Sequence, residues 1–481
     1  MTISTQVLDA LAGIVGPTWV RNDQATREAF AADGLPTAHQ EPDAVVFPGN
    51  RDQVIRVLGV LAHHGVPFVA RGAGTGLSGG GLAGTDTVLL PLTRLNRILA
   101  LDPENRRAVV EPGVVNASLS RAAAPYGLCY APDPSSQTVS TLGGNVAENA
   151  GGPHCLKYGV TTQHVLAMEV VLASGAVVEL GSASGEAWGP DLAGVFVGSE
   201  GTFGIATRIT VRLTPIASAV ETLLADFPSL RSAGEAVTAI IGAGLIPAAM
   251  EIMDQTCVQV VEASIYRAGY PTDAAAVLLV EVDGRNVDAV NDQAEHVERL
   301  LRASGARSVR RAREARDRER LWQGRKKTFG ALGRLRPHLL VQDAVVPRTA
   351  LPEILDTIGD IARRYEVTVG NVFHAGDGNL HPNIAYDGRV PGERARVERA
   401  AAEIMRACIA AGGTITGEHG VGSDKLGYMA DLFDATTLGA MRDVRRAFDP
   451  EERANPGKVL PIHACRAWHA HPVTTPVPQL A

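Results

Sequence analysis

Two histidines, His374 and His381, flank an Asp-Gly pair in the segment HAGDGNLHPN. Asp-Gly between two strand-like runs is a strong hairpin signal. With Asp377 and Gly378 in the two turn positions, His374 faces His381, and residues opposed in this way have Cβ atoms about 4.5–5.5 Å apart. Asn383 lies two residues past His381 and points to the same side. The spacing therefore predicts two imidazoles and an amide aimed at one point.

A second segment, GGTITGEHGVG over residues 412–422, offers a carboxylate, Glu418, and another imidazole, His419, between glycines. Two histidines and one carboxylate with open coordination positions suit Zn²⁺, Mn²⁺ or Fe²⁺. The residues alone leave one alternative open, in which His374 and His381 pack against each other across two strands and bind no ion.

The run Arg71–Gly81 (RGAGTGLSGGG) contains the pattern G-x-G-x-x-G at Gly74, Gly76 and Gly79. In a dinucleotide-binding fold the last glycine would open an amphipathic helix. Here the chain goes directly into a strand-like run from Thr87, so we expect no nicotinamide site. The N–H groups of such a loop can converge on a phosphate, although an ordinary flexible loop has the same composition.

Two further runs of glycines and hydroxyl-bearing residues follow in the same part of the chain. The first covers Pro132–Gly152 and continues into Lys157–Thr161, and the second covers Gly198–Ile205. Three such loops in one small domain could surround the pyrophosphate and the ring system of a flavin nucleotide. The three runs in this order indicate a flavin-binding domain more specifically than any one run does alone.

The residues between 42 and 215 are predicted to form an α+β domain. Asn50 can cap a helix, because Gln53 lies three residues on and an apolar stripe follows, and Gly65 ends it. Strands are expected at Val66–Ala70, Thr87–Pro91, Ala108–Glu111, Val165–Leu172, Ala176–Leu180 and Ile205–Leu213. The last of these alternates, with its two arginines on the outer face.

After Pro215 the pattern indicates a second α+β unit. Strands and helices are expected around the two histidines and at Ala276–Val282, Val287–Arg302, Leu339–Asp343, Leu351–Arg364 and Arg394–Ala411. The stretch Arg307–Arg320 is rich in arginine, but acidic residues are interleaved with the arginines. We therefore expect a solvated, salt-bridged helix there and not a nucleic-acid surface.

These loops and motifs resemble those of a known family. The residues between 42 and 215 resemble the FAD-binding domain of the vanillyl-alcohol oxidase/PCMH flavoprotein family, with Arg71–Gly80 as its pyrophosphate cradle and Pro132–Gly152 and Ser199–Ile205 as its other FAD segments. With the C-terminal half, the resemblance covers residues 42–460. It is greatest to FAD-linked 2-hydroxyacid dehydrogenases, a group that includes D-lactate dehydrogenase and the FAD subunit of bacterial glycolate oxidase.

The resemblance implies an α+β fold of two domains, a PCMH-type FAD-binding domain and an α+β (ferredoxin-like) substrate domain. A C-terminal segment is expected to return to the FAD domain through Asn455-Pro-Gly-Lys458. The implied boundaries are 1–41 for an N-terminal helical segment, 42–215 for the FAD domain, 216–420 for the substrate and metal domain, 421–463 for the C-terminal segment and 464–481 for a disordered tail.

The resemblance also implies which residues hold FAD. Some relatives attach the flavin covalently through His or Cys, and His154 and Cys155 lie near the second segment. The most similar branch holds FAD noncovalently, and we expect the same here. The implied FAD-binding residues are Arg71, Gly72, Ala73, Gly74, Thr75, Gly76, Ser78, Gly79, Pro132, Ser135, Thr138, Thr141, Gly144, Asn145, Ala147, Asn149, Gly151, Tyr158, Glu200, Gly204, Ile205 and Asn455.

The family shares the motifs H-A-G-D-G-N-L-H and G-E-H-G-V-G, which imply a divalent metal, with zinc ahead of manganese and iron. The implied ligands are His374, His381 and Glu418. His419 is the implied general base, which takes the hydroxyl proton while hydride passes from Cα to flavin N5. Arg325 matches the family's substrate arginine, and a guanidinium can bind both oxygens of a carboxylate. Asn383 could hydrogen-bond the hydroxyl or the carboxylate.

One departure from relatives bears on the substrate. The similar D-2-hydroxyglutarate dehydrogenases carry a lysine before the acid that corresponds to Asp343 and a threonine where this chain has Phe329. A second carboxylate would lack its partner here and be costly to bury. We therefore expect a D-2-hydroxy monocarboxylate such as D-lactate or glycolate. The alternatives are D-2-hydroxyglutarate, another alcohol for a PCMH-type oxidase, a zinc hydrolase and a non-catalytic flavin-binding subunit.

The composition limits the partners. A net charge of −7 over 481 residues disfavours nucleic acid. The five cysteines form no C-x-x-C pair, so we expect electrons to pass to an iron–sulfur partner subunit, a quinone or a soluble electron carrier. The sequence shows no signal peptide and no transmembrane run, which favours a cytoplasmic location. Peripheral attachment to the inner membrane and a homodimer stay open.

Overall fold

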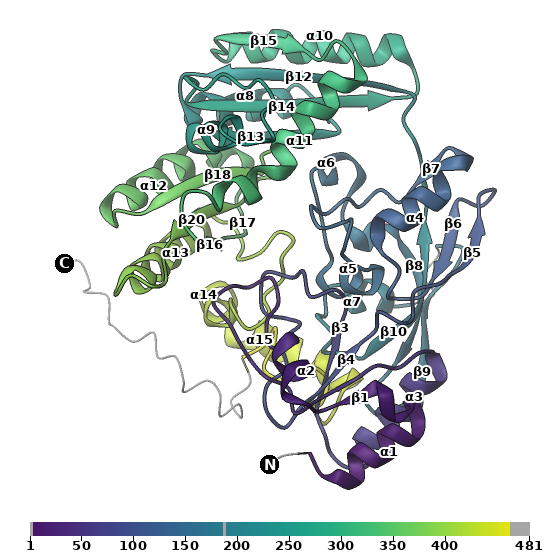
Figure 1. Ribbon diagram of the computed structural model, residues 1–481. Helices are drawn as coiled ribbons and strands as arrows, with labels where there is room; N and C mark the ends of the chain where they lie inside the picture. Colours follow the sequence, from purple (N-terminus) through teal and green to yellow (C-terminus); the bar gives the residue numbers. More distant parts are fainter. Residues whose placement is uncertain (1–2, 186–188, 462–481) are drawn as a thin grey trace.

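The computed structural model describes residues 3–185 and 189–461, which form two lobes (Figure 1). The N-terminal lobe holds a four-stranded and a five-stranded sheet, and the central lobe holds a large antiparallel sheet. The tail expected to be disordered, residues 464–481, lies outside the described residues. Within the described part of the chain, no helix is long and apolar enough to cross a membrane.

The four-stranded sheet of the N-terminal lobe has the order β1-β2-β4-β3, with β2, β4 and β3 parallel. Its strands are β1 (Val20–Arg21), β2 (Ala44–Val46), β3 (Phe68–Arg71) and β4 (Val88–Pro91). Helix α3 (Arg51–His63) connects β2 to β3 and begins as predicted, because the side chain of Asn50 accepts a hydrogen bond from the N–H group of Gln53. Its buried face shares a core with α1 (Thr5–Val15).

The five-stranded sheet is antiparallel and has the order β5-β6-β10-β8-β9. Its strands are β5 (Ile98–Asp102), β6 (Arg107–Val110), β8 (Val165–Val171), β9 (Val177–Gly181) and β10 (Ile205–Arg212). The predicted outward positions of Arg208 and Arg212 in β10 are confirmed, since both are exposed. Ala206 and Thr210 on the same face are buried, so the predicted alternation is only partial. The connections of this sheet carry α4 (Asn116–Ala123), β7 (Leu128–Cys129), α5 (Leu142–Glu148), α6 (Cys155–Tyr158) and α7 (Leu192–Phe196). The helix α2 (Gln24–Ala29) lies between β1 and β2 of the four-stranded sheet, and β11 (Thr214–Pro215) follows β10 and pairs with β7.

The sheet of the central lobe is covered by helices on both faces. Its order is β15-β12-β14-β13-β18-β19-β17, and β16 and β20 extend it beside β18. The strands are β12 (Ala219–Phe227), β13 (Ala249–Asp254), β14 (Ala276–Gly284), β15 (Ser308–Arg311), β16 (His338–Val341), β17 (Ala344–Val345), β18 (Thr368–His374), β19 (Asn379–Leu380) and β20 (Pro382–Tyr386). Alternate residues of β14 enter two separate cores, which explains why its apolar run is continuous.

The two faces of this sheet carry different helices. One core includes residues of α8 (Leu230–Gly242), α10 (Val287–Ala303), α12 (Leu351–Arg364) and α13 (Glu393–Ala410). The other includes residues of α9 (Gln255–Glu262) and α11 (Ala315–Leu332). The helix predicted at Leu351–Arg364 is confirmed at both ends. The α+β architecture with two domains is confirmed as well.

The arginine-rich stretch is a helix only in its second half. Residues Ser308–Arg311 form the edge strand β15, which pairs with β12, and α11 begins at Ala315. The predicted ion pairs are present, since Arg310 contacts Asp317 and Arg311 contacts Glu298. The prediction of one continuous helix is wrong because pairing with β12, a strand far away in the sequence, holds the first arginines in an extended conformation.

The hairpin register predicted for the two histidines is also wrong. His374 pairs with Asn379, and the turn takes the four residues 375–378. Gly378 has a φ of 78° and packs so closely on Val346 that a Cβ there would lie 2.3 Å from its carbonyl oxygen. Residues Asn379 and Leu380 pair with β17 on their other side. This tertiary contact, which has no local signal, sets the wider turn.

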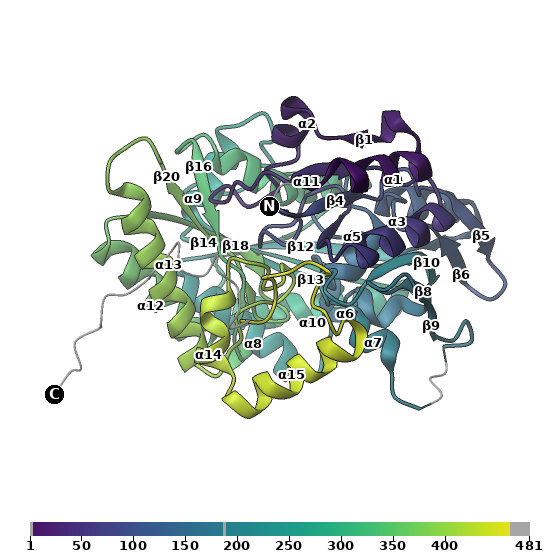
Figure 2. The same cartoon turned by 90° about the horizontal axis from the view of Figure 1, so that it is seen from below.

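The C-terminal segment contacts both lobes, and Figure 2 shows its helix α15 (Ala435–Phe448) in yellow. Leu438 belongs to the core of the central lobe, whereas Phe448 packs on Phe196 and Phe203 of the N-terminal lobe. The short α14 (Met429–Leu432) precedes α15. Main-chain hydrogen bonds join Phe68 of β3 to Arg453 and Asn455, so the chain returns along the free edge of the four-stranded sheet. The side chain of Asn455 donates to the carbonyl oxygens of Gly80 and Glu200 and ties two glycine-rich loops together.

Candidate active site

A cavity of about 600 Å³ lies between the two lobes, and the glycine-rich loops and the histidine cluster both line it. The N-terminal lobe contributes residues from 70–81, 134–151 and 196–206. Opposite them lie residues of α11 and of β18 and the pair Glu418 and His419. The groups predicted to bind a cofactor, a metal and a substrate therefore meet in one space.

The glycine loop between β3 and β4 presents main chain to this cavity. No helix follows it within the described residues 72–87, as predicted. Gly74 has a φ of 69°, and a Cβ at Gly72 would lie 2.5 Å from Oγ1 of Thr141. Side chains larger than hydrogen would therefore displace the neighbouring loop. The guanidinium of Arg71 donates to the carbonyl oxygens of Phe30 and Ala32, so this predicted cofactor residue braces the N-terminal segment.

The second loop contains polar groups that need a partner. Ser140 and Asn145 line the cavity and are buried, and neither Oγ of Ser140 nor Nδ2 of Asn145 has a hydrogen-bond partner among the described residues. A buried donor without an acceptor is costly. Donors of this kind beside glycine-lined main chain fit the oxygen atoms of a diphosphate, so the residues present suit a phosphate-bearing nucleotide.

The carboxyl groups of Glu148 and Glu200 are buried next to Gly80 of the glycine loop. Glu200 accepts hydrogen bonds of 2.7 Å from the N–H groups of both Val421 and Gly422, and burial raises the pKa of its carboxyl to about 7. Burial, with the nearby charge of Glu200, raises the pKa of Glu148 well above its usual range. Glu148 and Asp33 line the cavity, although the sequence did not predict this. An isolated acidic residue shows no local sequence pattern that indicates burial.

Most predicted cofactor residues line the cavity, but several do not. Ser78 donates to the main chain at His419, Gly79 packs near Ser423, and the side chain of Asn149 holds Thr162. Thr138 is exposed. The residues outside the lining are Ser78, Gly79, Pro132, Thr138, Asn149, Tyr158 and Asn455. Those in the lining are Arg71, Gly72, Ala73, Gly74, Thr75, Gly76, Ser135, Thr141, Gly144, Asn145, Ala147, Gly151, Glu200, Gly204 and Ile205.

The side chains of His374, His381 and Glu418 converge although the predicted register is wrong. The Nε2 atoms of both histidines lie 3.2 Å from Oε1 of Glu418, and the imidazole ring centroids are 5.2 Å apart. The three ligand atoms lie within 4.8 Å of one another. All three side chains line the cavity.

The hydrogen bonds behind the two rings engage Nδ1 of each histidine, so that both Nε2 atoms face Glu418. Nδ1 of His374 lies 2.7 Å from Glu251, and Nδ1 of His381 lies 3.2 Å from the carbonyl oxygen of Gln342. Acceptors in these places keep the proton on Nδ1. Nε2 of His374 is in hydrogen-bond contact with Oε1 of Glu418, whereas Nε2 of His381 makes no hydrogen bond among the described residues. Two imidazole lone pairs and one carboxylate fit a divalent ion.

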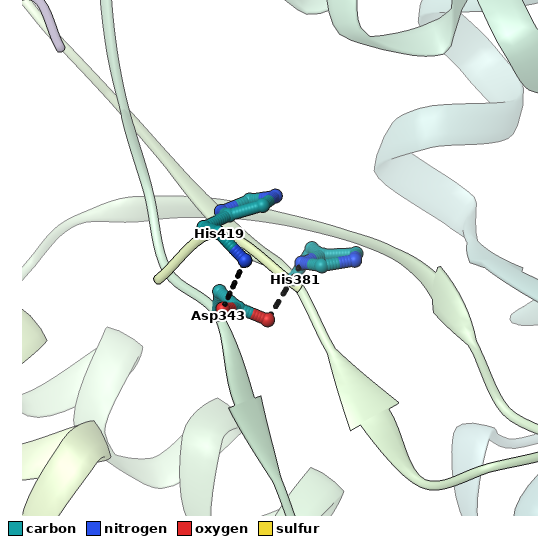
Figure 3. A group of neighbouring side chains, drawn as sticks. All are labelled: Asp343, His381 and His419. Carbon is teal, nitrogen blue, oxygen red and sulfur yellow. Dashed lines mark hydrogen bonds and ion pairs between the residues drawn. The ribbon is translucent and has the colours of Figure 1, made fainter. Parts of the chain in front are cut away.

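Asp343, His381 and His419 form a second cluster, which Figure 3 shows. Asp343 accepts hydrogen bonds from the hydroxyl of Thr416, the main-chain N–H of His419 and the ammonium of Lys425. Burial raises the pKa of Asp343, but Lys425, His419, His381 and the hydrogen bond from Thr416 together outweigh it and hold that pKa far below its usual range. Asp343 therefore organises the segment 416–425, and its oxygens are already satisfied.

His419 lies flat against His381, with ring centroids 4.9 Å apart and planes 10° apart. Burial lowers the pKa of His419 to about 4, against the attraction of Asp343. The imidazole is therefore neutral at pH 7 and can accept a proton. Gly420 has a φ of 82°, and a Cβ there would collide with Glu148 and Glu200, so the turn after His419 requires glycine.

The remaining two predicted catalytic residues line the cavity but are already engaged. Arg325 of α11 bonds Glu251 through Nε at 2.7 Å and Nη2 at 2.5 Å, so part of its guanidinium is bound within the protein. The Nδ2 group of Asn383 donates to the carbonyl oxygens of His381 and Gly370. Lys326, Lys327 and Phe329 of the same helix also line the cavity, and sequence reasoning did not place the two lysines there.

His154 and Cys155 join the lobes. The imidazole of His154 lies 2.9 Å from Asp133 and 3.3 Å from Glu281 of the central lobe. Burial lowers the pKa of His154, but these two carboxylates outweigh it and raise that pKa to about 10. Burial raises the pKa of the Cys155 thiol far above its usual range, which disfavours the reactive thiolate.

Two domain models match the chain, one described as the FAD binding domain over residues 42–181 and the other as the C-terminal domain of FAD linked oxidases over residues 216–459. The glycolate oxidase subunit GlcD of Escherichia coli K12 is 45% identical over 94% of this chain and 91% of its own length. A D-lactate dehydrogenase of Anaerostipes hadrus is 31% identical over 91% and 93%. The structure of p-cresol methylhydroxylase has the same fold, with a TM-score of 0.81 at 18% identity over 94% and 96%.

Proposed function

The chain belongs to the FAD-linked oxidase family, and from this we propose that it oxidises a small D-2-hydroxy monocarboxylate, such as D-lactate or glycolate, to the 2-oxo acid. The observation that carries the proposal is the cavity in which donor-lined glycine loops face the cluster of His374, His381 and Glu418. A zinc hydrolase would use the cluster but would leave these loops without a role. A non-catalytic flavin subunit would need neither the cluster nor His419.

The roles of the site residues follow from their positions. FAD, when bound, supplies the hydride acceptor, and a divalent ion held by His374, His381 and Glu418 supplies a Lewis acid for the substrate oxygens. His419 is neutral and faces the cavity, so its imidazole can accept the hydroxyl proton of the substrate. Asn383 borders the same space and helps to orient the substrate through its amide.

We propose Arg325 as the binding group for the substrate carboxylate. Glu251 engages Nε and Nη2, and three of the five N–H donors of an arginine remain for the cavity side. The absence of a lysine directly before Asp343 and the apolar side chains of Val341, Val372 and Phe329 around the cavity favour a single carboxylate. Of the two lysines in the lining, Lys326 is paired with Asp133 and Lys327 lies over the ring of Tyr266.

We propose that FAD is held noncovalently. Both ring nitrogens of His154 lie against carboxylates, and the thiol of Cys155 is held protonated, so neither residue is poised to attack the flavin. The separate sheets support 42–215 as the FAD-binding domain and 216–420 as the substrate domain. The core of the substrate domain also includes Val421, Met429, Leu438 and Leu460 of the C-terminal segment. Because the similar GlcD protein is a subunit by name, we propose an iron–sulfur partner subunit as electron acceptor, ahead of a quinone or a soluble carrier.

One experiment tests the proposal. The purified protein is kept free of oxygen, and its flavin absorbance is followed after addition of D-lactate, L-lactate, glycolate or D-2-hydroxyglutarate. We expect rapid bleaching by D-lactate or glycolate and slow bleaching by L-lactate. Faster bleaching by D-2-hydroxyglutarate would contradict the monocarboxylate assignment, and a colourless protein would contradict the whole proposal.

A further inference from the structure

Glu251 lies directly behind His374, on the side of the ring that faces away from Glu418. It belongs to β13, and the two residues are opposite each other in the β13–β18 ladder. Oε1 of Glu251 is 2.7 Å from Nδ1 of His374, and the carboxylate is fully buried. The strand register therefore places the carboxylate beside the ring, and His374 cannot turn away without losing this hydrogen bond.

Arg325 supplies the counter-charge for this carboxylate. Its Nε and Nη2 atoms both bond Oε2 of Glu251, and Arg325 is itself 6% exposed. One carboxylate oxygen of Glu251, Oε1, therefore contacts the imidazole of His374, and the other, Oε2, contacts the guanidinium of Arg325. A buried carboxylate is stable when it is paired and fully hydrogen-bonded, and this one satisfies both conditions.

We propose that Glu251 is the positioning residue of the metal ligand His374, and that Arg325 acts on the metal cluster through Glu251 as well as on the substrate. The inference rests on the proposed function, because it assumes an ion held by His374, His381 and Glu418. A carboxylate at Nδ1 keeps the proton on that atom, fixes the ring and leaves Nε2 as a more basic ligand.

The two histidine ligands differ in how they are held. The hydrogen-bond partner of His381 Nδ1 is the neutral carbonyl oxygen of Gln342 at 3.2 Å, and the carboxylate of Asp343 is farther away, at 3.9 Å. The partner of His374 Nδ1 is a buried anion at 2.7 Å. A hydrogen bond to an ionised acceptor is stronger than one to a neutral acceptor. Loss of Glu251 therefore weakens the ligand that is held most firmly.

The test measures the affinity of the FAD-loaded protein for Zn²⁺ in the absence of substrate, by competition with a chromophoric chelator. We expect Glu251→Gln to bind FAD in the normal ratio and to bind Zn²⁺ about 10–100 times more weakly. Asp254→Asn is the matched control, because Asp254 is a buried carboxylate on the same strand whose contacts lie away from the cluster, at Cys257 and Asn371. It should lose stability and keep its affinity for Zn²⁺.

Arg325→Lys separates the two roles of the arginine. A lysine keeps the charge but loses the fork that holds Glu251, so we expect weaker Zn²⁺ binding even without substrate. If Glu251→Gln fails to fold, the double variant Glu251→Gln/Arg325→Met removes both charges of the pair and is expected to show the same weak binding. Unchanged affinity for Zn²⁺ in Glu251→Gln would overturn the role of Glu251 and leave the metal assignment intact. A wild-type protein that binds no Zn²⁺ would overturn the metal assignment and the inference together.

Discussion

The hydroxyl group of Ser78 donates a 2.9 Å hydrogen bond to the main-chain carbonyl of His419, so the glycine loop of the N-terminal lobe holds the proposed base directly. The carbonyl oxygen of Ser78 accepts from the N–H groups of Ser423 and Asp424 on the same segment. A Cβ at Gly422 would lie 2.0 Å from that oxygen. Cofactor loop and base are therefore one packed unit.

We predict that Ser78→Ala lowers the rate of flavin reduction several-fold and destabilises the protein by about 1–3 kcal/mol, because the carbonyl of His419 loses its buried partner. Urea denaturation and anaerobic stopped-flow absorbance measure the two effects. Ser264→Ala is a matched control, since Ser264 is also buried and donates to the carbonyl oxygen of Val261 near the end of α9. Equal rates of flavin reduction in both variants would contradict the proposal that Ser78 positions His419.

A second prediction concerns Gly151, where the N-terminal lobe touches the metal cluster. A Cβ at this position would lie 2.8 Å from Oε2 of Glu418 and 3.1 Å from Sγ of Cys155. Gly151→Ala should therefore displace Glu418 and lower the bound Zn²⁺, measured by elemental analysis and expressed per bound FAD. Gly427→Ala has no atom within 4 Å of the new Cβ and should keep its metal. Full Zn²⁺ occupancy in Gly151→Ala would contradict the prediction that a side chain at position 151 displaces Glu418.

Local patterns predicted much of the fold. The helix that starts after Asn50 and the helix Leu351–Arg364 lie where capping and apolar spacing placed them. The strand β13 was not predicted, although it carries Glu251 to His374. The two residues are 123 positions apart in the chain, and no short-range signal reports which distant strands will pair.

The convergence of His374, His381 and Glu418 was predicted, but from an incorrect hairpin register. His374 pairs with Asn379 and not with His381, yet the two rings still meet because His381 leaves the ladder and Glu418 arrives from another segment. The residue types and their motif were informative, whereas the assumed two-residue turn was not. The engagement of Arg325 by Glu251 could not be foreseen, since it depends on tertiary contact between α11 and β13.

A third prediction concerns the pH dependence of stability at the junction of the lobes. The folded-state pKa of His154 is raised from 6.5 to about 10 by Asp133 and Glu281. Its charged form therefore stabilises the fold fully below pH 6.5, and this contribution is lost as pH rises through about 10. We expect the free energy of unfolding to fall by a few kcal/mol between pH 7 and pH 10.

His154→Gln should be less stable than wild type at pH 7 and should lose little more stability by pH 10, because the titrating group is gone. His39→Gln controls for removal of a histidine, since His39 and its partner Glu28 are exposed. Urea denaturation at several pH values measures both. A wild-type profile that stays flat from pH 7 to pH 10 would contradict an ionised His154.

A fourth prediction separates the proposed base from the proposed ligand, whose rings lie against each other. His419→Ala should keep FAD and Zn²⁺, because the Nε2 atoms of His374 and His381 and the carboxylate of Glu418 are untouched. It should lose flavin reduction by about 10²–10⁴-fold, the usual contribution of a general base. His381→Ala should lose Zn²⁺ first and reduction as a consequence. If His419→Ala still reduced its flavin at the wild-type rate, another group must take the proton; if it lost Zn²⁺ as His381→Ala does, His419 would belong to the metal site.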